Sequence, residues 1–188
     1  MKTIEASVEA VLIADHPETF VTRRIPETRF EFGGIPGDRH FGITRPADSR
    51  QPMYPRGTEI FNRRQITVLS AEECMDIAEK LQIDSLLPEW LGANLLLRGV
   101  PDLTSLTIGS RLLFPSGAGL VCQGENLPCT LPGKVIQEMH TNRPELTTEF
   151  VRAAFKQRGI VCLVECPGQV RQGDLVRILV NDFAKPLQ

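Results

Sequence analysis

Cys129 is the residue whose surroundings in the sequence best suit chemistry with a molecule outside the protein. It directly follows Pro128, in a Pro- and Gly-rich turn that ends the apolar run Gly119-Leu120-Val121. A structural cysteine is normally found inside an apolar run, whereas a thiolate that acts as nucleophile or metal ligand needs a polar, accessible environment. The position beside Asn126 therefore predicts a functional thiolate.

The other four cysteines have less telling positions. Cys74 falls on the apolar face of an expected helix, and Cys162 and Cys166 alternate onto one face of an expected strand, so all three are interpreted as core residues. Cys122 is undecided, and a redox-sensing disulfide between Cys122 and Cys129 is one alternative. An odd number of cysteines, with no CxxC pair and no His at zinc spacing, indicates reduced thiols and no zinc site.

A second candidate for ligand contact is the glycine-rich turn at residues 33–42, which contains Asp38 and His40. Glycines allow a backbone to approach a ligand closely. A wide loop in which Asp38 caps a turn explains the same residues and, without other information, is the better interpretation.

Residues 43–64 form a long Arg- and Pro-rich segment with no evident secondary structure. Arginines bind phosphate or carboxylate groups through paired hydrogen bonds, but a solvated surface loop is an equally good interpretation of Arg45, Arg50 and Arg56. Arg63 and Arg64 differ because they directly precede a strand, which gives them a fixed direction.

The elements that must position these residues are mostly short strands. Residues 2–14 alternate apolar and polar, and residues 65–69 form a strand that leads into a helix through the capping box Ser70–Glu73. Further expected elements are a strand that starts at Asn94, a hairpin through residues 116–119, a helix from Thr147 or Thr148 to Arg158, and a hairpin over residues 159–180. The pattern predicts one mainly β domain over residues 1–188, a closed or partly open barrel with two or three peripheral helices.

Composition limits the function classes. The 188 residues are 41% hydrophobic and carry a net charge of −2, so no global field attracts nucleic acid or a membrane surface. With no basic-apolar leader and no long apolar run, a soluble cytoplasmic protein is expected.

Four motifs occur in one order: residues 37–42 (GDRHFG), 64–69 (RQITVL), 91–95 (LGANL) and 127–129 (LPC), followed by the Gly- and Val-rich segment from Gly159 to Asp174. This ordered set resembles the MOSC domain, the module named after the C-terminal part of molybdenum cofactor sulfurases, and the small stand-alone bacterial members of that family. The resemblance covers most of the chain.

The resemblance implies a barrel fold and a functional cysteine, Cys129, that either carries sulfur as a persulfide or ligates the molybdenum of a bound molybdopterin cofactor. It places Asp38, His40, Arg64 and Asn94 at the site. Arg98 and Asn126 are added as expected cofactor-binding residues, with Arg64, Arg98 and His40 suited to the cofactor phosphate.

One position departs from the family pattern. The Gly-Glu-Asn turn of many relatives corresponds here to Gly92-Ala93-Asn94, so the acid is absent. Glu125, in the loop that leads to Cys129, is a candidate replacement.

Three functions remain open on the sequence. One is sulfur transfer to metal-sulfur cofactors, with the persulfide supplied by a pyridoxal-phosphate cysteine desulfurase partner. Another is molybdenum-dependent reduction of N-hydroxylated compounds, with a separate electron-donor protein. The third is a non-catalytic module that stores or delivers the molybdenum cofactor.

Overall fold

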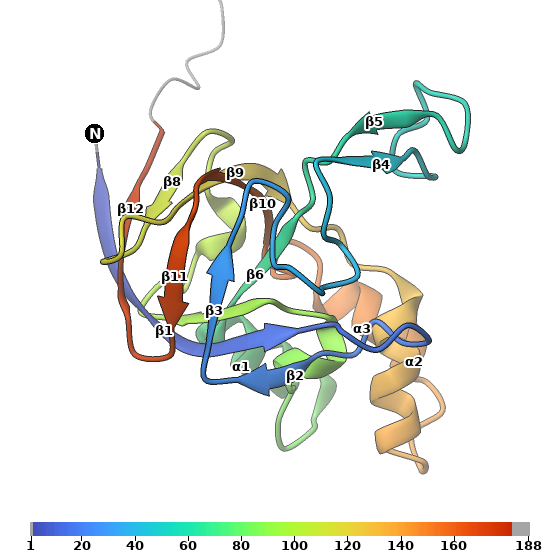
Figure 1. Ribbon diagram of the computed structural model, residues 1–188. Helices are drawn as coiled ribbons and strands as arrows, with labels where there is room; N and C mark the ends of the chain where they lie inside the picture. Colours follow the sequence, from blue (N-terminus) through green and yellow to red (C-terminus); the bar gives the residue numbers. More distant parts are fainter. Residues whose placement is uncertain (1, 182–188) are drawn as a thin grey trace, which may run out of the picture.

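Seven strands close into a β-barrel in the computed structural model, which describes residues 2–181 (Figure 1). Around the barrel, each strand is hydrogen-bonded to the next and the last returns to the first. The order is β1 (Thr3–Ile13), β12 (Leu175–Leu179), β8 (Arg111–Leu113), β9 (Gly119–Glu125), β10 (Ile160–Cys166), β6 (Ile66–Ser70) and β7 (Leu95–Arg98). All pairs are antiparallel except β6–β7. The expected mainly β barrel is confirmed.

Strand β1 closes the barrel because it pairs with β12 through its first half and with β7 through its second. Its register shifts between Val8 and Ala10. Ala6 and Val8 point into the barrel, and beyond the shift Val11 and Ile13 do so, whereas Leu12 packs on the helical side. The even alternation that predicted this strand therefore holds only up to the bulge.

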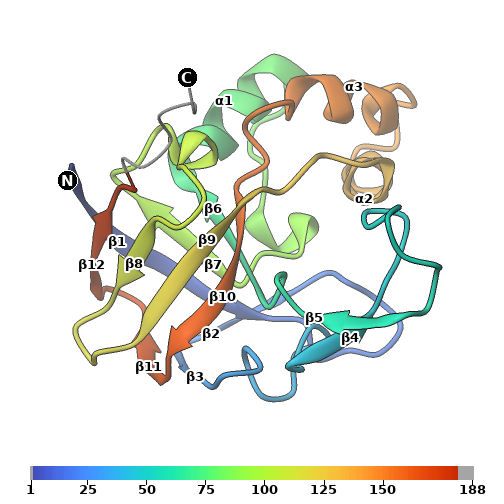
Figure 2. The same ribbon diagram turned by 90° about the horizontal axis from the view of Figure 1, so that it is seen from above.

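Three helices cover one side of the barrel (Figure 2). They are α1 (Ala71–Leu81), α2 (Thr130–Met139) and α3 (Leu146–Ala153), with 3₁₀ turns η1 (Pro88–Leu91) and η2 (Leu103–Ser105) nearby. Leu12, Leu69 and Leu96 point outward from the barrel and form a second core with Ile77 and Phe150 of the helices. Over residues 2–181, no helix is long and apolar enough to cross a membrane.

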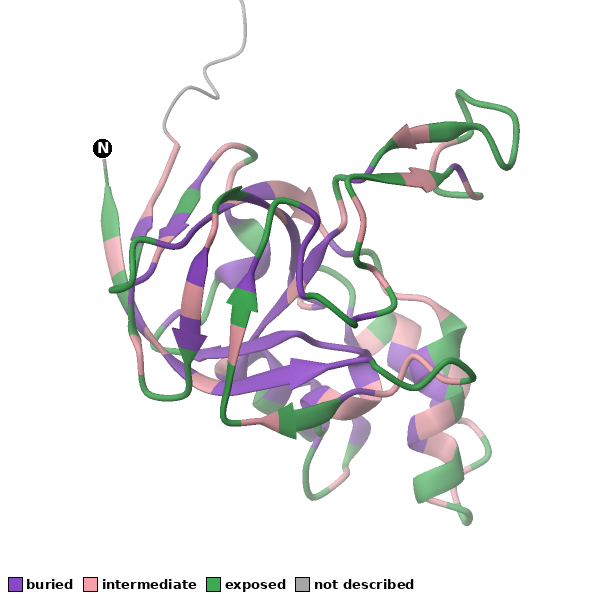
Figure 3. Ribbon diagram, in the orientation of Figure 1, coloured by how far each residue is buried: buried purple, intermediate pink, exposed green. Residues whose placement is uncertain are grey.

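Two small sheets and an extra strand decorate the barrel. Strand β2 (Arg23–Ile25) extends the pairing of β1, and β3 (Glu27–Phe30) pairs with β11 (Gly168–Arg171). Strands β4 (Thr44–Pro46) and β5 (Glu59–Phe61) pair with each other in an arm, residues 43–62, that projects from the barrel and is mostly exposed (Figure 3). The segment expected to lack structure is thus a hairpin.

Two expectations about the C-terminal third are wrong. The helix predicted to reach Arg158 ends at Ala153, and a run of turns follows. The two halves of the hairpin predicted over residues 159–180 do not pair with each other, because β10 pairs with β9 and β6, β11 pairs with β3, and β12 pairs with β8 and β1. Long-range barrel closure outweighs the local turn between them.

The capping box at the start of α1 is only half formed. Ser70 Oγ accepts a hydrogen bond from the Glu73 amide, as expected. The Glu73 carboxylate instead accepts hydrogen bonds from the amide and hydroxyl of Thr104, at 2.8 and 2.7 Å. Burial raises the pKa of Glu73 to about 7, although the bonds from Thr104 oppose the rise.

This buried carboxyl gives a pH-dependent prediction. Between its ordinary pKa of 4.5 and about 7, Glu73 is protonated in the folded protein but ionised in the unfolded chain, so stability falls as pH rises through that window. Glu73→Gln should remove this fall, which amounts to at most about 3 kcal/mol. Urea unfolding at pH 5 and pH 7.5 measures it, with the exposed Glu79→Gln as control. An equal pH dependence in wild type and Glu73→Gln would contradict the prediction.

Candidate functional site

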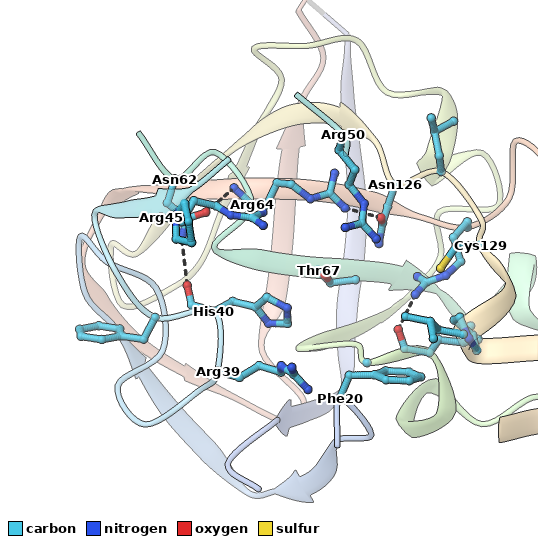
Figure 4. A pocket seen from close by; sticks show the side chains of 18 of the residues that line it. Phe20, Arg39, His40, Arg45, Arg50, Asn62, Arg64, Thr67, Asn126 and Cys129 are labelled. Carbon is cyan, nitrogen blue, oxygen red and sulfur yellow. Dashed lines mark hydrogen bonds between the residues drawn. The ribbon is translucent and has the colours of Figure 1, made fainter. Parts of the chain in front are cut away.

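A cavity of about 510 Å³ lies between the arm, the glycine-rich turn and the start of α2 (Figure 4). Its walls combine cationic, amide and apolar side chains from these three regions with residues of β6 and η1. The lining residues on which the description below depends are Arg39, His40, Arg45, Arg50, Asn62, Arg64, Thr67, Asn126, Cys129 and Arg158. The site therefore brings together most of the residues expected from the sequence.

Cys129 occupies the N-cap position of α2, with the extended backbone angles φ −139° and ψ 173°. The first residues of this helix leave unpaired amides that favour a negative charge. The Cys129 side chain makes no capping hydrogen bond, and the residue is half-buried in the cavity wall. Its sulfur is thus available to a ligand.

The direction of α2 depends on its contact with α3. Gly133 is buried in the first turns of α2, and a Cβ atom at this position would lie 2.5 Å from the carbonyl oxygen of Thr147. The Thr147 hydroxyl also donates to Gln137 Oε1 at 2.8 Å. This close approach of the two helices determines where Cys129 lies.

Asp38 and Asn94 are supports behind the cavity and do not line it. Asp38 Oδ2 accepts hydrogen bonds from the Ala14 amide and from Asn94 Nδ2, at 2.8 and 2.9 Å. Asn94 Oδ1 accepts from the Thr67 amide at 2.9 Å. Burial by itself would raise the pKa of Asp38, but hydrogen bonds from the His40 ring and from the Ala14 and His40 amides hold it below its ordinary value.

The ionised Asp38 orients His40. Asp38 Oδ1 lies 2.8 Å from the His40 amide and 3.0 Å from His40 Nδ1. Because the carboxylate can only accept, Nδ1 carries a proton and Nε2 is the ring nitrogen left for a ligand. His40 itself lines the cavity, as expected.

Arg64 crosses the cavity wall from the start of β6 to the loop before Cys129. Its Nη2 donates to Asn126 Oδ1 at 2.7 Å, and its amide donates to Asn62 Oδ1 at 3.0 Å. Burial, reinforced by Arg50 and Arg45, lowers the pKa of Arg64 to about 10, so the group is still charged near neutral pH. Arg64 and Asn126 therefore both lie in the wall of this cavity.

Arg158 is a buried cavity residue that the sequence did not reveal. It was interpreted as a helix-end residue, yet it is only 6% exposed and its guanidinium donates to the Leu91 carbonyl. Burial lowers its pKa to about 10. One signal was available: Arg158 stands just before an apolar strand that begins at Ile160, as Arg64 stands just before β6.

The charge balance of the lining is strongly positive. It contains five arginines and no Asp, Glu or Lys. The nearby Asp48 is engaged by Arg45 at 2.6 Å and by Arg50 at 3.3 Å. Within the described residues, no hydrogen bond or ion pair joins Arg64 or Arg158 to a carboxylate. The cavity is therefore suited to an anionic ligand.

Two expected residues lie elsewhere. Arg98 is on the opposite face of β7 from the barrel interior, where it is exposed and pairs with Glu9 at 2.7 Å. It borders a different hollow, between α1 and η1, so its expected contact with a cofactor phosphate is wrong for this cavity. Glu125 does not line the cavity either; its Oε1 accepts from the Lys156 amide at 3.2 Å. Ala93, which stands where many relatives have Glu, is fully buried and packs in the core between the barrel and the helices.

The cysteines also divide differently from the expectation. All five are free thiols, so the Cys122–Cys129 disulfide is not formed, and Cys122 is buried inside the barrel. Cys74 and Cys162 are core residues as expected. Cys166 is exposed, because the β9–β10 register shifts between Val164 and Cys166. No group of three His, Cys, Asp or Glu side chains within residues 2–181 could hold a metal ion unaided.

A family model matches most of the chain. Residues 36–177 match the model of the MOSC domain, and the chain belongs to this family. Its similarity to one bacterial relative extends almost end to end. It is 54% identical over 177 residues to YuaD of Bacillus subtilis strain 168, covering 94% of this chain and 92% of YuaD, which carries a provisional assignment to metal-sulfur cluster biosynthesis.

Solved structures support the same assignment. The crystal structure of YuaD from Bacillus subtilis superimposes with a TM-score of 0.93 at 53% identity and covers 96% of this chain and 98% of that one. YiiM from Geobacillus stearothermophilus gives a TM-score of 0.62 at 12% identity, over 94% and 75% of the two chains, and shares the fold.

The helix contact at Gly133 gives a prediction about the position of Cys129. Gly133→Ala places a methyl group against the Thr147 backbone, so α2 must shift. We expect a loss of about 1–3 kcal/mol in unfolding free energy and an altered rate of Cys129 alkylation. The neighbouring exposed Lys134→Ala is the control. A Gly133→Ala protein as stable and as reactive as Lys134→Ala would show that the contact does not set the site.

Proposed function

We propose that this protein carries sulfur on Cys129, as a persulfide, for transfer to metal-sulfur cofactors. The observation that carries the proposal is the location of Cys129. It is the cysteine, out of five, that lines the cationic cavity, and it does so at the N-terminus of a helix. The provisional assignment of YuaD to metal-sulfur cluster biosynthesis is in keeping with such a role.

The chemistry requires a thiolate that reaches a donor sulfur and then presents it to an acceptor. The Cys129 thiolate attacks the outer sulfur of a donor persulfide, the sulfur–sulfur bond of the donor breaks, and the donor thiolate leaves with the electron pair. Cys129 then carries a terminal sulfur with a negative charge. Arg64 and Arg158 can stabilise that charge, and the N-terminal end of α2 adds a further favourable field. A cysteine desulfurase is one protein that could supply the sulfur.

This proposal is tested with two cysteine variants. The protein is incubated with a cysteine desulfurase and free cysteine, and intact mass is measured for an added sulfur atom. Cys129→Ser should abolish the added mass, whereas Cys166→Ser, which removes an exposed thiol outside the cavity, should retain it. Equal loading of Cys129→Ser and wild type would refute the assignment of Cys129.

A second candidate is binding of the molybdenum cofactor, which the cavity volume and charge favour. The residues present fit such a group: Cys129 offers one soft sulfur ligand, and the pterin dithiolene would have to supply the others, because this part of the chain forms no three-residue metal cluster. Arg64, Arg158 and His40 would hold its phosphate. The bound metal would supply redox chemistry, as in a reductase of N-hydroxylated compounds with a separate electron donor; without turnover, the same binding defines a delivery module.

The cofactor proposal has its own prediction. After expression in a host that makes the cofactor, molybdenum near one atom per chain is expected, and Arg64→Gln should weaken retention roughly 10- to 100-fold by removing charge-assisted hydrogen bonds. Arg177→Gln, exposed on β12 away from the cavity, is the control. Wild-type protein free of molybdenum and pterin would exclude cofactor binding and leave sulfur carriage as the remaining candidate.

A further inference from the structure

Arg158 is a buried cation without an acid partner. It is 6% exposed, its Nη2 donates to the Leu91 carbonyl, and its Nη1 is buried without a hydrogen-bond partner in the described part of the chain. A buried guanidinium is costly unless an anion or hydrogen-bond acceptors compensate it. The charge of Arg158 therefore has no carboxylate counter-charge among its hydrogen-bond partners in this part of the chain, and the residue borders the cavity.

The charged or ionisable side chains that act on Arg158 leave one candidate anion within the protein. Arg50 and Arg64 oppose its charge, while Cys74 and Cys129 would favour it if they were ionised. Burial raises the pKa of Cys74 to about 12, so that thiol stays neutral. Cys129 remains, and it lies in the same cavity wall as Arg158.

The backbone joins the Arg158 segment to the Cys129 loop. The Gly159 carbonyl accepts from the Asn126 amide at 2.9 Å, and the Lys156 amide donates to Glu125 Oε1 at 3.2 Å. Gly159 has φ +76°, and a Cβ atom there would lie 2.2 Å from the Val68 carbonyl oxygen, so the chain cannot easily shift at this point. The guanidinium is thus held in place relative to the cysteine loop.

We propose that Arg158 and the N-terminal end of α2 form an anion subsite beside Cys129, and that the sulfur donor is a small sulfane-sulfur oxyanion of the thiosulfate class. The inference rests on the proposed sulfur-carrier function. A thiolate and a dianionic donor repel each other, so their reaction needs cations at the point of contact. The lining supplies five arginines and no carboxylate, which suits a small oxyanion, and a sulfonate group matches the paired donors of a guanidinium.

The step balances without an external oxidant or reductant. The Cys129 thiolate attacks the outer sulfur of thiosulfate, and a bond forms between Cys129 Sγ and that sulfur. The sulfur–sulfur bond of thiosulfate breaks, and its electron pair leaves with sulfite. The products are the Cys129 persulfide anion and sulfite, and an acceptor such as cyanide then removes the outer sulfur as thiocyanate.

The test measures thiocyanate formation from thiosulfate and cyanide by the full-length protein. Wild type should turn over and Cys129→Ser should not. Arg158→Gln should lower kcat/KM roughly 10- to 100-fold, and Arg158→Lys should recover part of the loss because it keeps the charge without the paired donors. Arg152→Gln, exposed on α3, is the matched control and should behave as wild type.

A second readout separates an anion subsite from a merely structural role. Cys129 should prefer iodoacetate to iodoacetamide, and Arg158→Gln should reduce that rate ratio while Arg152→Gln does not. An unchanged ratio and unchanged turnover in Arg158→Gln would overturn the subsite. If a cysteine desulfurase loads wild-type Cys129 but thiosulfate does not, the donor assignment is wrong while sulfur carriage stands. If neither donor loads Cys129, both proposals fail.

Discussion

The hydrogen bonds of Asn94 are the constraint on which the site depends. Its backbone amide donates to the Thr67 carbonyl, its carbonyl accepts from the Leu12 amide, its Oδ1 accepts from the Thr67 amide and its Nδ2 donates to Asp38. Every polar group of this buried residue is therefore paired, and β1, β6, β7 and the glycine-rich turn are joined at one point. His40 reaches the cavity because Asp38 is held there. The acid Asp38 and the amide Asn94 act by holding other groups in place, which explains how residues of the motifs can matter without lining the cavity.

Buried positive charge is the second property that organises the site. Arg64 and Arg158 lie in the cavity wall with amide and carbonyl partners in place of carboxylates. Such partners fix the orientation of each guanidinium but neutralise no charge. A bound anion would therefore offset the desolvation cost of burying the two groups. The carboxylates close to the cavity are already engaged, Asp38 by His40 and Asp48 by Arg45 and Arg50. The wall is thus electrostatically prepared for a negative ligand.

Features that depend on local sequence could be predicted, whereas residue positions that depend on how the strands pair to close the barrel could not. The barrel class, the Ser70 cap and the polar turn at Cys129 follow from periodicity, turn residues and motif order, and the structure has them. Arg98 was misplaced because the face of β7 that it occupies is set by pairing with β1, which no local pattern reveals. Arg158 was missed for a related reason: α3 ends at Ala153, and the turns that follow carry the arginine inward. The exposure of Cys166 likewise follows from a register shift between β9 and β10.

The composition of the cavity also limits which reactions it can support. His40 is the lining histidine, and no carboxylate lines the cavity to act beside it as an acid or base. Hydrolysis by paired carboxylates is therefore not supported, since both partners of such a pair are missing from the wall. What the wall does offer is a soft nucleophile, cations and helix amides. A terminal persulfide and a cofactor phosphate are both anions, so the same arginines would suit either of the two proposed roles. The surrounding positive charge suits both roles equally. They differ in whether the Cys129 sulfur would bond to another sulfur or to a metal.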